Sequence, residues 1–524
     1  MKNNRKEIED KYIFTSEITL NKKTEEVEEI GESAFNLIKS NKKKYIYFEN
    51  IKINLDPKKS GKNEKIETKF PIKYSIKLET VIKEYLKKIS DIALNKLNIK
   101  GHNYTKNEIK WVVTVPAIWN EHGKQFMKNC AKKAGMKDIL ISLEPEAASL
   151  NMFDDPYIDN NYKKKDKIFM LIDAGGYTVD ITLNQIVDRF RNLKQLSPPS
   201  GGSFGSMNIN LEIIKIFEKI FGKETFEQFQ MKKTNEWGKL KERIEEIKIG
   251  ICIDKVDSNV FEFDNYFSSW FSKKKEFKIK NETITYDKYK IYIPKSLISN
   301  IIIQQVDKTI NHVKKLLKKF NTTKIDQFIL TGGFSNCHIM KNRLKETFNS
   351  TDINQLSNPE RSISRGAALF GLKPNQIVSR IAPYTIGLSG YELQREGTEC
   401  RNEKIIDDVS KCEYFISFIT KGEDIKNNLT ISQSYIPAND EQDSLGFVLY
   451  YSNLEKPVYI DEKSVNEIAQ FSIEANETHL PKKERKVLVE MKFSSYITVA
   501  AKNVNSGKEV SINANYYDHY DMDD

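Results

Sequence analysis

An acidic residue and a glycine-rich turn lie between two short apolar runs, Ile168–Ile172 and Val179–Leu183. Asp173 opens the turn, and Gly175 and Gly176 form its centre. The pattern predicts a strand–turn–strand hairpin. Glycine lets backbone N–H groups come close to a phosphate, and a carboxylate at a strand end can hold Mg²⁺ through water. The stretch therefore predicts a phosphate and magnesium site, and a tight turn without a ligand is the alternative.

Two further glycine-containing turns follow along the chain, and one of them comes directly after an apolar strand pattern. Their residues are Gly201, Gly202, Gly205, Gly332, Gly333 and Phe334. One such turn is weak support for a ligand site. Three of them in one chain, with an acidic residue at a strand end, favour a nucleotide site over unrelated turns.

Four charged residues near these turns are candidates for the same site. Asp180 either holds the metal or caps the hairpin turn. Glu144 stands before Pro145 at the end of a strand pattern, where it either faces a metal or stabilises a helix N-terminus. Glu245 and Lys248 are three residues apart on one helix face, and taken alone they are typical of an ordinary surface ion pair.

The elements that must position these residues alternate between strands and helices. Short apolar runs predict strands at 109–116, 139–143, 168–172, 179–183, 288–293 and 325–330. Apolar spacing of three and four predicts helices at 75–98, 121–135, 209–221, 233–250, 297–320 and 339–348. The alternation is typical of an α/β domain, which we place at residues 1–373.

The pattern changes after Pro374, where helical periodicity nearly vanishes. Seven short runs of alternating apolar and polar residues follow, which is typical of an all-β sandwich. We place this domain at 381–515, after a linker at 374–380. The acidic end of the chain, 516–524, reads as a solvated tail.

Composition excludes several classes of protein. The chain has 524 residues, of which 39% are hydrophobic and 11% aromatic, so it is too apolar to be disordered. The net charge of +10 comes mostly from Lys, whereas specific nucleic-acid readers favour Arg, so we expect no nucleic-acid partner. No apolar stretch approaches the ~18 residues of a membrane helix, and the charged start is no secretory signal. We therefore expect a cytoplasmic protein that does not contact a membrane.

The five cysteines are scattered and form no CxxC or Cys/His cluster. They are Cys130, Cys252, Cys337, Cys400 and Cys412. The spacing predicts neither a disulfide framework nor a zinc site, so we expect buried structural thiols.

Five segments occur in the order found in the seventy-kilodalton heat-shock chaperone family, which the chain resembles from about residue 11 onward. The segments are Trp111–Trp119, Leu143–Ala148, Asp173–Asp180, Gly201–Gly205 and Leu330–Phe334. The chain looks most similar to the divergent branch that lacks a C-terminal helical lid. The resemblance implies an α/β, actin-like ATPase domain whose two lobes close on a nucleotide. It also implies that the β part is a substrate-binding sandwich.

The resemblance implies a role for each matching residue. Asp173 would hold Mg²⁺ or orient the attacking water, with Asp180 as a second metal candidate, and Glu144 would meet the water shell of the metal. Thr178 and Lys52 complete the implied catalytic set, Lys52 as the lysine on the phosphate side. The implied ATP contacts are Gly175, Gly176, Gly201, Gly202, Gly205, Glu245, Lys248, Gly332, Gly333 and Phe334.

The chain also departs from the family pattern. The family begins with a strand–loop–strand that grips the phosphates with an acidic residue, a glycine and two threonines. Nothing in residues 1–10 matches this first phosphate loop, which would leave a strand edge exposed. Tyr177 replaces a glycine in the second phosphate loop, and residues 374–380 lack the acidic and leucine-rich linker pattern.

Three hypotheses remain. The first is a chaperone-like protein that binds ATP and Mg²⁺ and couples nucleotide state to binding of unfolded or extended polypeptide, with co-chaperones as further partners. Whether it hydrolyses ATP stays open. The second is a non-catalytic relative that acts as a protein-interaction module, and the third is a truncated gene product. A sugar kinase of the same fold is disfavoured because the C-terminal β-sandwich has no place in that family.

Overall fold

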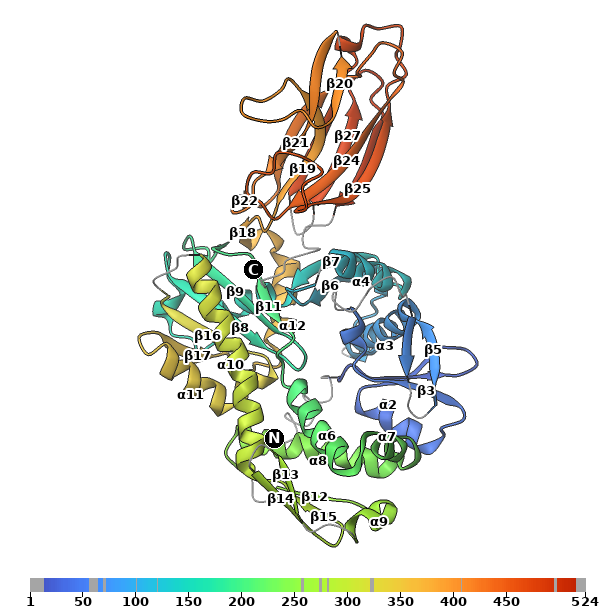
Figure 1. Ribbon diagram of the computed structural model, residues 1–524, viewed down its shortest axis with the longest axis vertical. Helices are drawn as coiled ribbons and strands as arrows, with labels where there is room; N and C mark the ends of the chain where they lie inside the picture. The colour runs from blue at the N-terminus through green and yellow to red at the C-terminus, as the bar shows by residue number, and fades with distance from the viewer. Residues whose placement is uncertain are drawn as a thin grey trace.

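The computed structural model describes residues 14–514, except 56–64, 69–71, 100, 120, 256–258, 273–275, 280–281, 321–324, 407 and 494–496. The chain is mixed α/β up to Leu372 and almost entirely β from Ile377 onward (Figure 1). The mixed α/β class expected from the sequence is confirmed. Within the described ranges, no helix is both long and apolar enough to cross a membrane. The acidic segment 516–524 lies outside the described residues.

An eight-stranded sheet forms the centre of the α/β part. Its strands are β8 (Ile168–Ala174), β9 (Val179–Ile186), β10 (Leu193–Gln195), β11 (Ser200–Gly202), β16 (Gln327–Thr331), β17 (Asp352–Gln355), β18 (Ile377–Ile381) and β22 (Asp424–Lys426). They run in the order β17-β16-β8-β9-β10-β18-β22, and β11 pairs with β9. β8 and β9 form the expected antiparallel hairpin, and β16 runs parallel to β8.

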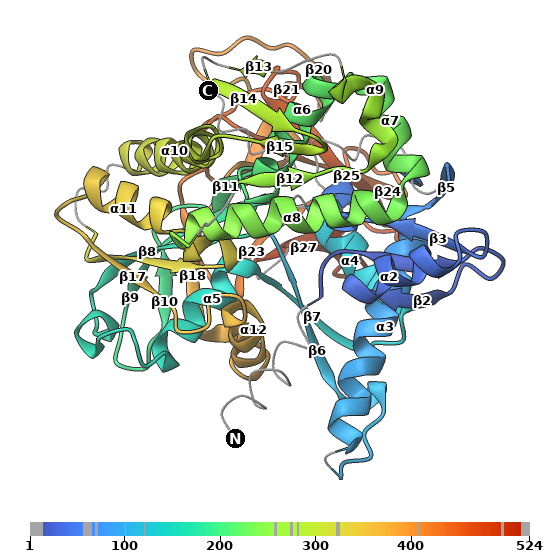
Figure 2. The ribbon, with the colours of Figure 1, turned by 90° about the horizontal axis from the view of Figure 1, so that it is seen from below.

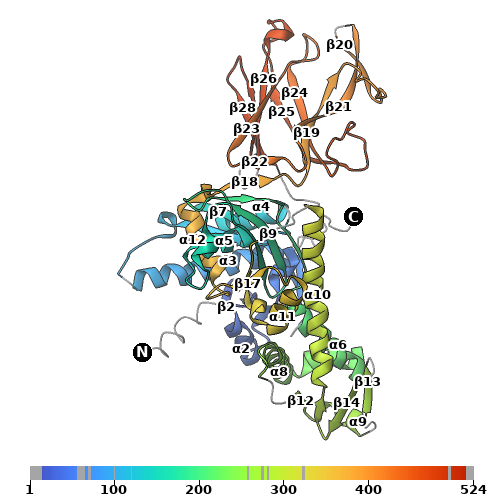
Figure 3. The ribbon, with the colours of Figure 1, turned by 90° about the vertical axis from the view of Figure 1, so that its left-hand side faces the viewer.

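Both faces of this sheet are covered by helices (Figure 3). Met170 and Ile172 of β8 pack in a core with helices α6 (Met207–Phe221), α10 (Lys295–Lys319) and α11 (His338–Thr347). Phe169 and Leu171 point the other way, into a core with α5 (Glu144–Asn151) and α12 (Ser362–Leu372). Burial on both sides explains why the strand reads as a continuous apolar run.

The residues between α6 and α10 form a helical and aromatic unit. It contains α7 (Lys223–Lys232), α8 (Thr234–Cys252), α9 (Ser268–Phe271) and the antiparallel strands β12 (Val260–Glu262), β13 (Glu276–Ile279), β14 (Glu282–Asp287) and β15 (Lys290–Tyr292). Stacked rings fill its core, with Phe221 and Phe267 centroids 3.8 Å apart. Helix α8 extends from this unit toward the N-terminal part of the chain, where Lys241 Nζ lies 2.8 Å from Glu49 Oε2 (Figure 2).

The described residues of the N-terminal part form three small sheets and three α-helices. These are β1 (Ile18–Asn21), β2 (Val27–Ile30) and β3 (Tyr45–Phe48); β4 (Lys65–Thr68) and β5 (Tyr74–Lys77); β6 (Lys110–Val115) and β7 (Asp138–Leu143); and α2 (Glu32–Ser40), α3 (Leu78–Ile99) and α4 (Glu121–Lys133). The predicted helix at 75–98 is wrong at its start, because residues 74–77 pair with β4 as a strand. Ile76 is buried and its neighbours are not, which is strand alternation rather than helical spacing.

Two antiparallel sheets form the C-terminal part. One comprises β19 (Thr385–Glu392), β20 (Glu403–Ile406), β21 (Val409–Ile419), β24 (Ser444–Ser452) and β25 (Val465–Glu474). The other comprises β23 (Leu429–Tyr435), β26 (Val487–Phe493), β27 (Ile497–Asn503) and β28 (Glu509–Ala514). Both contribute to one core, where Leu388 and Leu449 of the first sheet meet Val489 and Val499 of the second.

The expectation that all five cysteines are free thiols is wrong. Cys400 and Cys412 form a disulfide with a Cα–Cα distance of 5.2 Å. Cys412 lies in β21, and the loop after β19 folds back beside that strand, which brings Cys400 to it. Tertiary folding of this loop creates the pair, and the linear spacing of the cysteines contains no sign of it. Cys130, Cys252 and Cys337 are buried free thiols, as expected.

Candidate functional site

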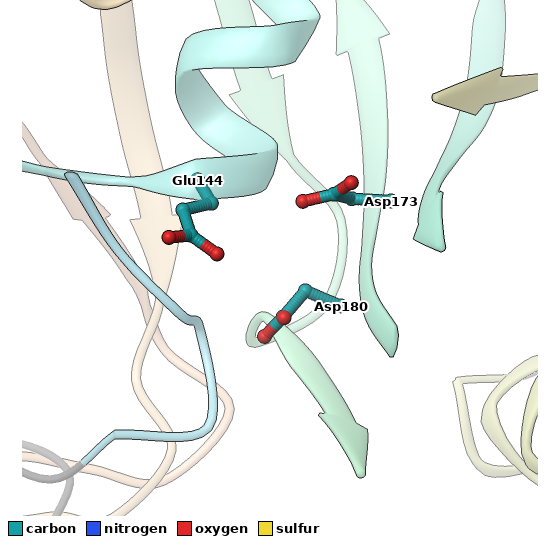
Figure 4. A group of neighbouring side chains, drawn as sticks. All are labelled: Glu144, Asp173 and Asp180. Carbon is teal, nitrogen blue, oxygen red and sulfur yellow. The ribbon is translucent and has the colours of Figure 1, made fainter. Parts of the chain in front are cut away.

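Three buried carboxylates meet where β8, β9 and α5 converge (Figure 4). Asp173 and Asp180 face each other across the antiparallel hairpin, and Glu144 is the first residue of α5. Oxygen atoms of the three side chains lie within 4.8 Å of one another. Like charges this close repel strongly at low dielectric, so a compensating cation is expected among them.

Two oxygens of this cluster have no hydrogen-bond partner among the described residues, Oδ1 of Asp173 and Oδ2 of Asp180. The other oxygen of Asp180 accepts a hydrogen bond from the Ala117 N–H at 2.6 Å. Burial, followed by the charge of Glu144, raises the pKa of both aspartates above the usual range. Buried carboxylate oxygens without donors are suitable ligands for a hard divalent cation, so these residues fit Mg²⁺.

Lys52 is the cationic neighbour of the cluster. Its Nζ lies 2.5 Å from Glu144 Oε1, and it comes from a short 3₁₀ turn, Ile51–Leu55, after β3. Burial alone would lower the pKa of Lys52, but Glu144 and then Asp180 and Asp173 raise it overall. The structure therefore places Lys52 with the three acids, as the sequence resemblance implied. One ammonium can pair with only one of the three carboxylates, so a further cation would be needed to offset the two aspartates when they are ionised.

The first two glycine turns pack directly against each other. The N–H of Gly205 donates to the carbonyl of Tyr177 at 2.9 Å, and the N–H of Met207 donates to Gly176 at 2.7 Å. A Cβ on Gly205 would lie 2.4 Å from the Gly176 carbonyl, and one on Gly201 would lie 2.1 Å from a carbonyl of β9. These contacts require glycine. Gly176 is exposed and a Cβ there would have ordinary contacts, so its backbone is open to a ligand.

Thr178 closes the hairpin turn and contacts the acids. Its carbonyl accepts the N–H of Gly175 at 3.0 Å, and its side chain forms a hydrogen bond with Asp180 that favours the ionised carboxylate. Gly202 lies on β11, which pairs with β9 beside Asp180. A Cβ on Gly202 would meet only the ring of Phe204, a side chain that can move.

The third turn reaches the same hairpin from β16. Gly332 has φ +79°, and a Cβ there would lie 2.4 Å from the carbonyl of Ala174 and 2.6 Å from Asp173 Oδ1. Only glycine satisfies both constraints. Gly333 has open space beside it, and Phe334 is buried in the central core. The second and third glycine turns therefore both contact the β8–β9 hairpin that carries Asp173 and Asp180.

Glu245 and Lys248 lie on helix α8. Lys248 Nζ is 2.7 Å from Glu245 Oε2, and the same oxygen accepts a hydrogen bond from Asn210 Nδ2 at 2.7 Å. Lys248 is 4% exposed. The side chain of Glu245 is 45% exposed, so the pair joins a buried ammonium to a carboxylate at the surface. The Lys248 charge acts on the thiol of Cys337, which follows the glycine turn.

Sequence reasoning missed one buried polar contact beside the site. Glu146, two residues after Glu144, forms a two-pronged ion pair with Arg380 of β18, at 2.9 and 3.1 Å. Gln195 Nε2 donates a third hydrogen bond to the Glu146 carboxylate at 2.8 Å. The partners are 234 residues apart in the chain, and no local pattern marks either of them.

Comparisons with known proteins identify the family of the chain. The family model described as Hsp70 protein matches residues 48–523. Heat shock 70 kDa protein 12A of Mus musculus is 23% identical over 92% of this chain and 81% of its own length. Heat shock 70 kDa protein 12B of Homo sapiens is 21% identical over 77% of this chain and 70% of its own. Chaperone protein DnaK of Carsonella ruddii (strain PV) is 25% identical over 57% of this chain and 48% of its own.

The chain belongs to the Hsp70 family, because the family model matches most of its length. Its similarity to the 12A and 12B proteins agrees with the divergent branch that the sequence motifs indicated. Family membership supports an ATP-binding, chaperone-like function in general terms.

Proposed function

We propose that the chain binds ATP with Mg²⁺ between two lobes of an actin-like domain. The observation that carries the proposal is the cluster of Glu144, Asp173 and Asp180, with two buried oxygens that lack partners beside a glycine hairpin. Bound Mg²⁺ would neutralise phosphate charge and orient the phosphates. Asp173 and Asp180 would hold it, directly or through water, and Glu144 would contact its water shell.

The surrounding residues have matching roles in this proposal. The exposed backbone of Gly176 would face the phosphates, while Gly175, Gly201, Gly202 and Gly205 would shape the two turns around them. Lys52 would balance charge on the phosphate side, and Thr178 would hold Asp180 ionised and oriented. Glu245 and Lys248 would contact the sugar and base, opposite Gly332, Gly333 and Phe334. Hydrolysis, if it occurs, would use Asp173 to orient the attacking water.

The β part would bind extended polypeptide, and β18 would connect the two functions. β18 pairs with β10 of the central sheet on one side and with β22 on the other. Arg380 of β18 holds Glu146 on the same helix as Glu144. A change at the carboxylate cluster therefore has a physical path to the strands that lead into the β part. A cytosolic location and co-chaperone partners belong to the same proposal.

A specific feature favours a second candidate, a relative that binds nucleotide without hydrolysing it. Tyr177 occupies the centre of the phosphate-side hairpin, where the resembling family has glycine, and its side chain is half-buried there. Phosphoryl transfer depends on accurate phosphate positioning, so crowding of this turn would reduce hydrolysis more than binding.

The experiment uses two fluorescent probes on the full chain. A fluorescent ATP analogue reports nucleotide binding with Mg²⁺ or with excess EDTA, and a labelled apolar heptapeptide reports polypeptide binding. We expect Mg²⁺-dependent nucleotide binding, and at least a fivefold change in peptide affinity when ATP is added. Nucleotide binding without turnover over hours would favour the second candidate. Peptide binding that is insensitive to ATP, with no nucleotide binding, would contradict both.

A further inference from the structure

Two buried cysteines meet between α8 and α11, on elements far apart in sequence. Cys252 is the last residue of α8, and Cys337 immediately precedes α11. Each thiol affects the pKa of the other, and both side chains are buried in the same core. The side chain of the adjacent His338 donates from Nδ1 to the carbonyl of Cys252 at 2.6 Å, which joins the start of α11 to the end of α8.

Both cysteines are buried close to an exposed residue. Cys252 is 7% exposed and Cys337 1%, and Ile253, which follows Cys252, is 44% exposed. Hydrogen peroxide therefore reaches the sulfurs only when this part of the structure opens locally. Cys130, the third free cysteine, is also buried, but it belongs to a different core in the N-terminal part of the chain.

The two thiols differ in their surroundings. The Cys252 thiol, the backbone N–H groups of Met340 and Ile339 at the start of α11, and the charge of Lys248 lower the pKa of Cys337 despite its burial. The interaction with Cys337, followed by burial, raises the pKa of Cys252. Such an asymmetric pair has one sulfur suited to attack and one suited to resolve the product.

We propose that Cys252 and Cys337 form a redox-modification site that takes a peroxide as oxidant. The sulfur of Cys337 attacks one peroxide oxygen, the O–O bond breaks, and a sulfenic acid and one water result. The Cys252 sulfur then displaces the hydroxyl from Cys337, which releases a second water and forms the disulfide. The two thiols lose two electrons and two protons, and the peroxide is reduced to two waters. A dithiol reductant restores the pair.

The position of the pair determines what the bond would do. One turn before Cys252, α8 carries Lys248, and the Gly332–Phe334 turn leads into Cys337. In the proposed function, α8 and the Gly332–Phe334 turn form the two walls of the adenosine site. The effect on nucleotide exchange therefore rests on the proposed function. A covalent bond between the walls would limit their separation, so nucleotide would enter and leave more slowly. The redox chemistry itself does not depend on nucleotide binding.

The test begins with peptide mapping of the full chain. The reduced protein is treated with hydrogen peroxide, remaining thiols are alkylated, and the peptides are analysed by mass spectrometry without reduction. We expect a linked peptide pair containing Cys252 and Cys337, lighter by two hydrogens than the free pair and lost after dithiothreitol. Alkylation of both residues after peroxide treatment, while other thiols are oxidised, would overturn the proposal.

Single variants make the assignment specific. Cys252→Ser should leave Cys337 as a sulfenic acid that a dimedone probe captures, and Cys337→Ser should leave Cys252 largely unreacted. Cys130→Ser is the matched control and should form the bond like the wild type. If a serine variant fails to fold, the corresponding alanine variant replaces it. Equal dimedone labelling of both single variants would contradict the assigned roles of the two sulfurs.

A second readout separates this inference from the proposed function. Release of the fluorescent ATP analogue is timed from oxidised and reduced protein. We expect release at least fivefold slower after oxidation, restored by dithiothreitol and absent in Cys252→Ser. A disulfide with unchanged release would overturn the consequence for nucleotide exchange. A disulfide in a protein that binds no nucleotide would leave the redox site standing and contradict the proposed function.

Discussion

Glu144 and Glu146 lie two residues apart on the same short helix, and both are buried, but their surroundings differ. Glu146 has a complete set of partners in Arg380 and Gln195. Glu144 has Lys52 on one side and two further carboxylates on the other, Asp173 and Asp180, each with an oxygen that no described residue satisfies. The hydrogen bonds of Glu146 are therefore satisfied, and we call its ion pair the complete contact. Glu144 belongs to a cluster in which two oxygens lack partners, and we call this cluster the incomplete site.

The comparison shows how to separate a structural charge from a ligand site when both are buried. A buried ion pair with all its hydrogen bonds made is destabilised when either partner is removed. A cluster of like charges with unpaired oxygens is costly without a ligand and gains from a cation. The two sites should therefore respond in opposite directions to the loss of a charge.

The largest effect is expected at the complete contact. Arg380→Met removes the charge that neutralises Glu146 and leaves a buried carboxylate, which should lower the free energy of unfolding by about 3–5 kcal/mol. Differential scanning calorimetry should show a lower midpoint for the α/β part. Arg191→Met, which removes a partner from the exposed ion pair with Asp154, is the control and should cost less than about 1 kcal/mol.

The double variant Glu146→Gln with Arg380→Met sharpens this prediction. It removes both charges, so it should recover much of the loss seen in Arg380→Met. A double variant as unstable as the single one would mean that Arg380 acts through packing rather than through Glu146.

A smaller effect is expected at a third buried titratable group, His312, whose ring nitrogen lies 3.2 Å from Ser200 Oγ. Burial and then Lys315 lower the pKa of His312 to about 4. The unfolded chain takes up the proton first as pH falls, so stability is complete above the ordinary pKa of 6.5 and is lost toward pH 4. At pH 5 the loss should be roughly 2 kcal/mol relative to pH 7.

Urea unfolding at pH 7 and pH 5 measures this loss. His312→Gln is neutral at both pH values, so its stability should change less than that of the wild type. An equal change in the two proteins would mean that other groups cause the pH dependence.

The smallest effect on stability, and one of opposite sign, is expected at the incomplete site. Asp173→Asn removes a carboxylate that is buried beside two other acids. Because its pKa is raised in the folded state, its ionisation lowers the stability of the fold as pH rises. The variant should therefore be more stable than the wild type without metal at pH 8, on the order of 1 kcal/mol. The gain should shrink as pH falls and the aspartate takes up its proton. Asp287→Asn, on an exposed strand residue, should change nothing.

Most helices and strands were predictable from the sequence, because the apolar residues in each recur at one clear spacing. The β8–β9 hairpin and α6 were predicted to within a few residues. The four-stranded sheet of β12 to β15 was mostly missed, with only one strand predicted there. Its strands are short, and their apolar residues pack in an aromatic core that helices share. The alternation of apolar and polar residues along these strands is therefore weak.

Contacts between distant residues were less predictable. Asp173, Glu144 and Asp180 were found because each adjoins a strand end in a recognisable motif. Glu146 with Arg380, Cys252 with Cys337, and Cys400 with Cys412 carry no such mark. The two residues of each pair lie on separate elements that folding brings together. Their distance along the sequence gives no sign of the contact.

Calorimetric titration of ATP into the full chain tests the central claim most directly, with Mg²⁺ or EDTA and with wild type or Asp173→Asn. We predict micromolar binding by the wild type that requires Mg²⁺, and binding at least a hundredfold weaker by Asp173→Asn, although that variant is the more stable protein. No heat from the folded wild type, or equal binding by both proteins, would contradict the assignment of these three carboxylates to a magnesium and nucleotide site.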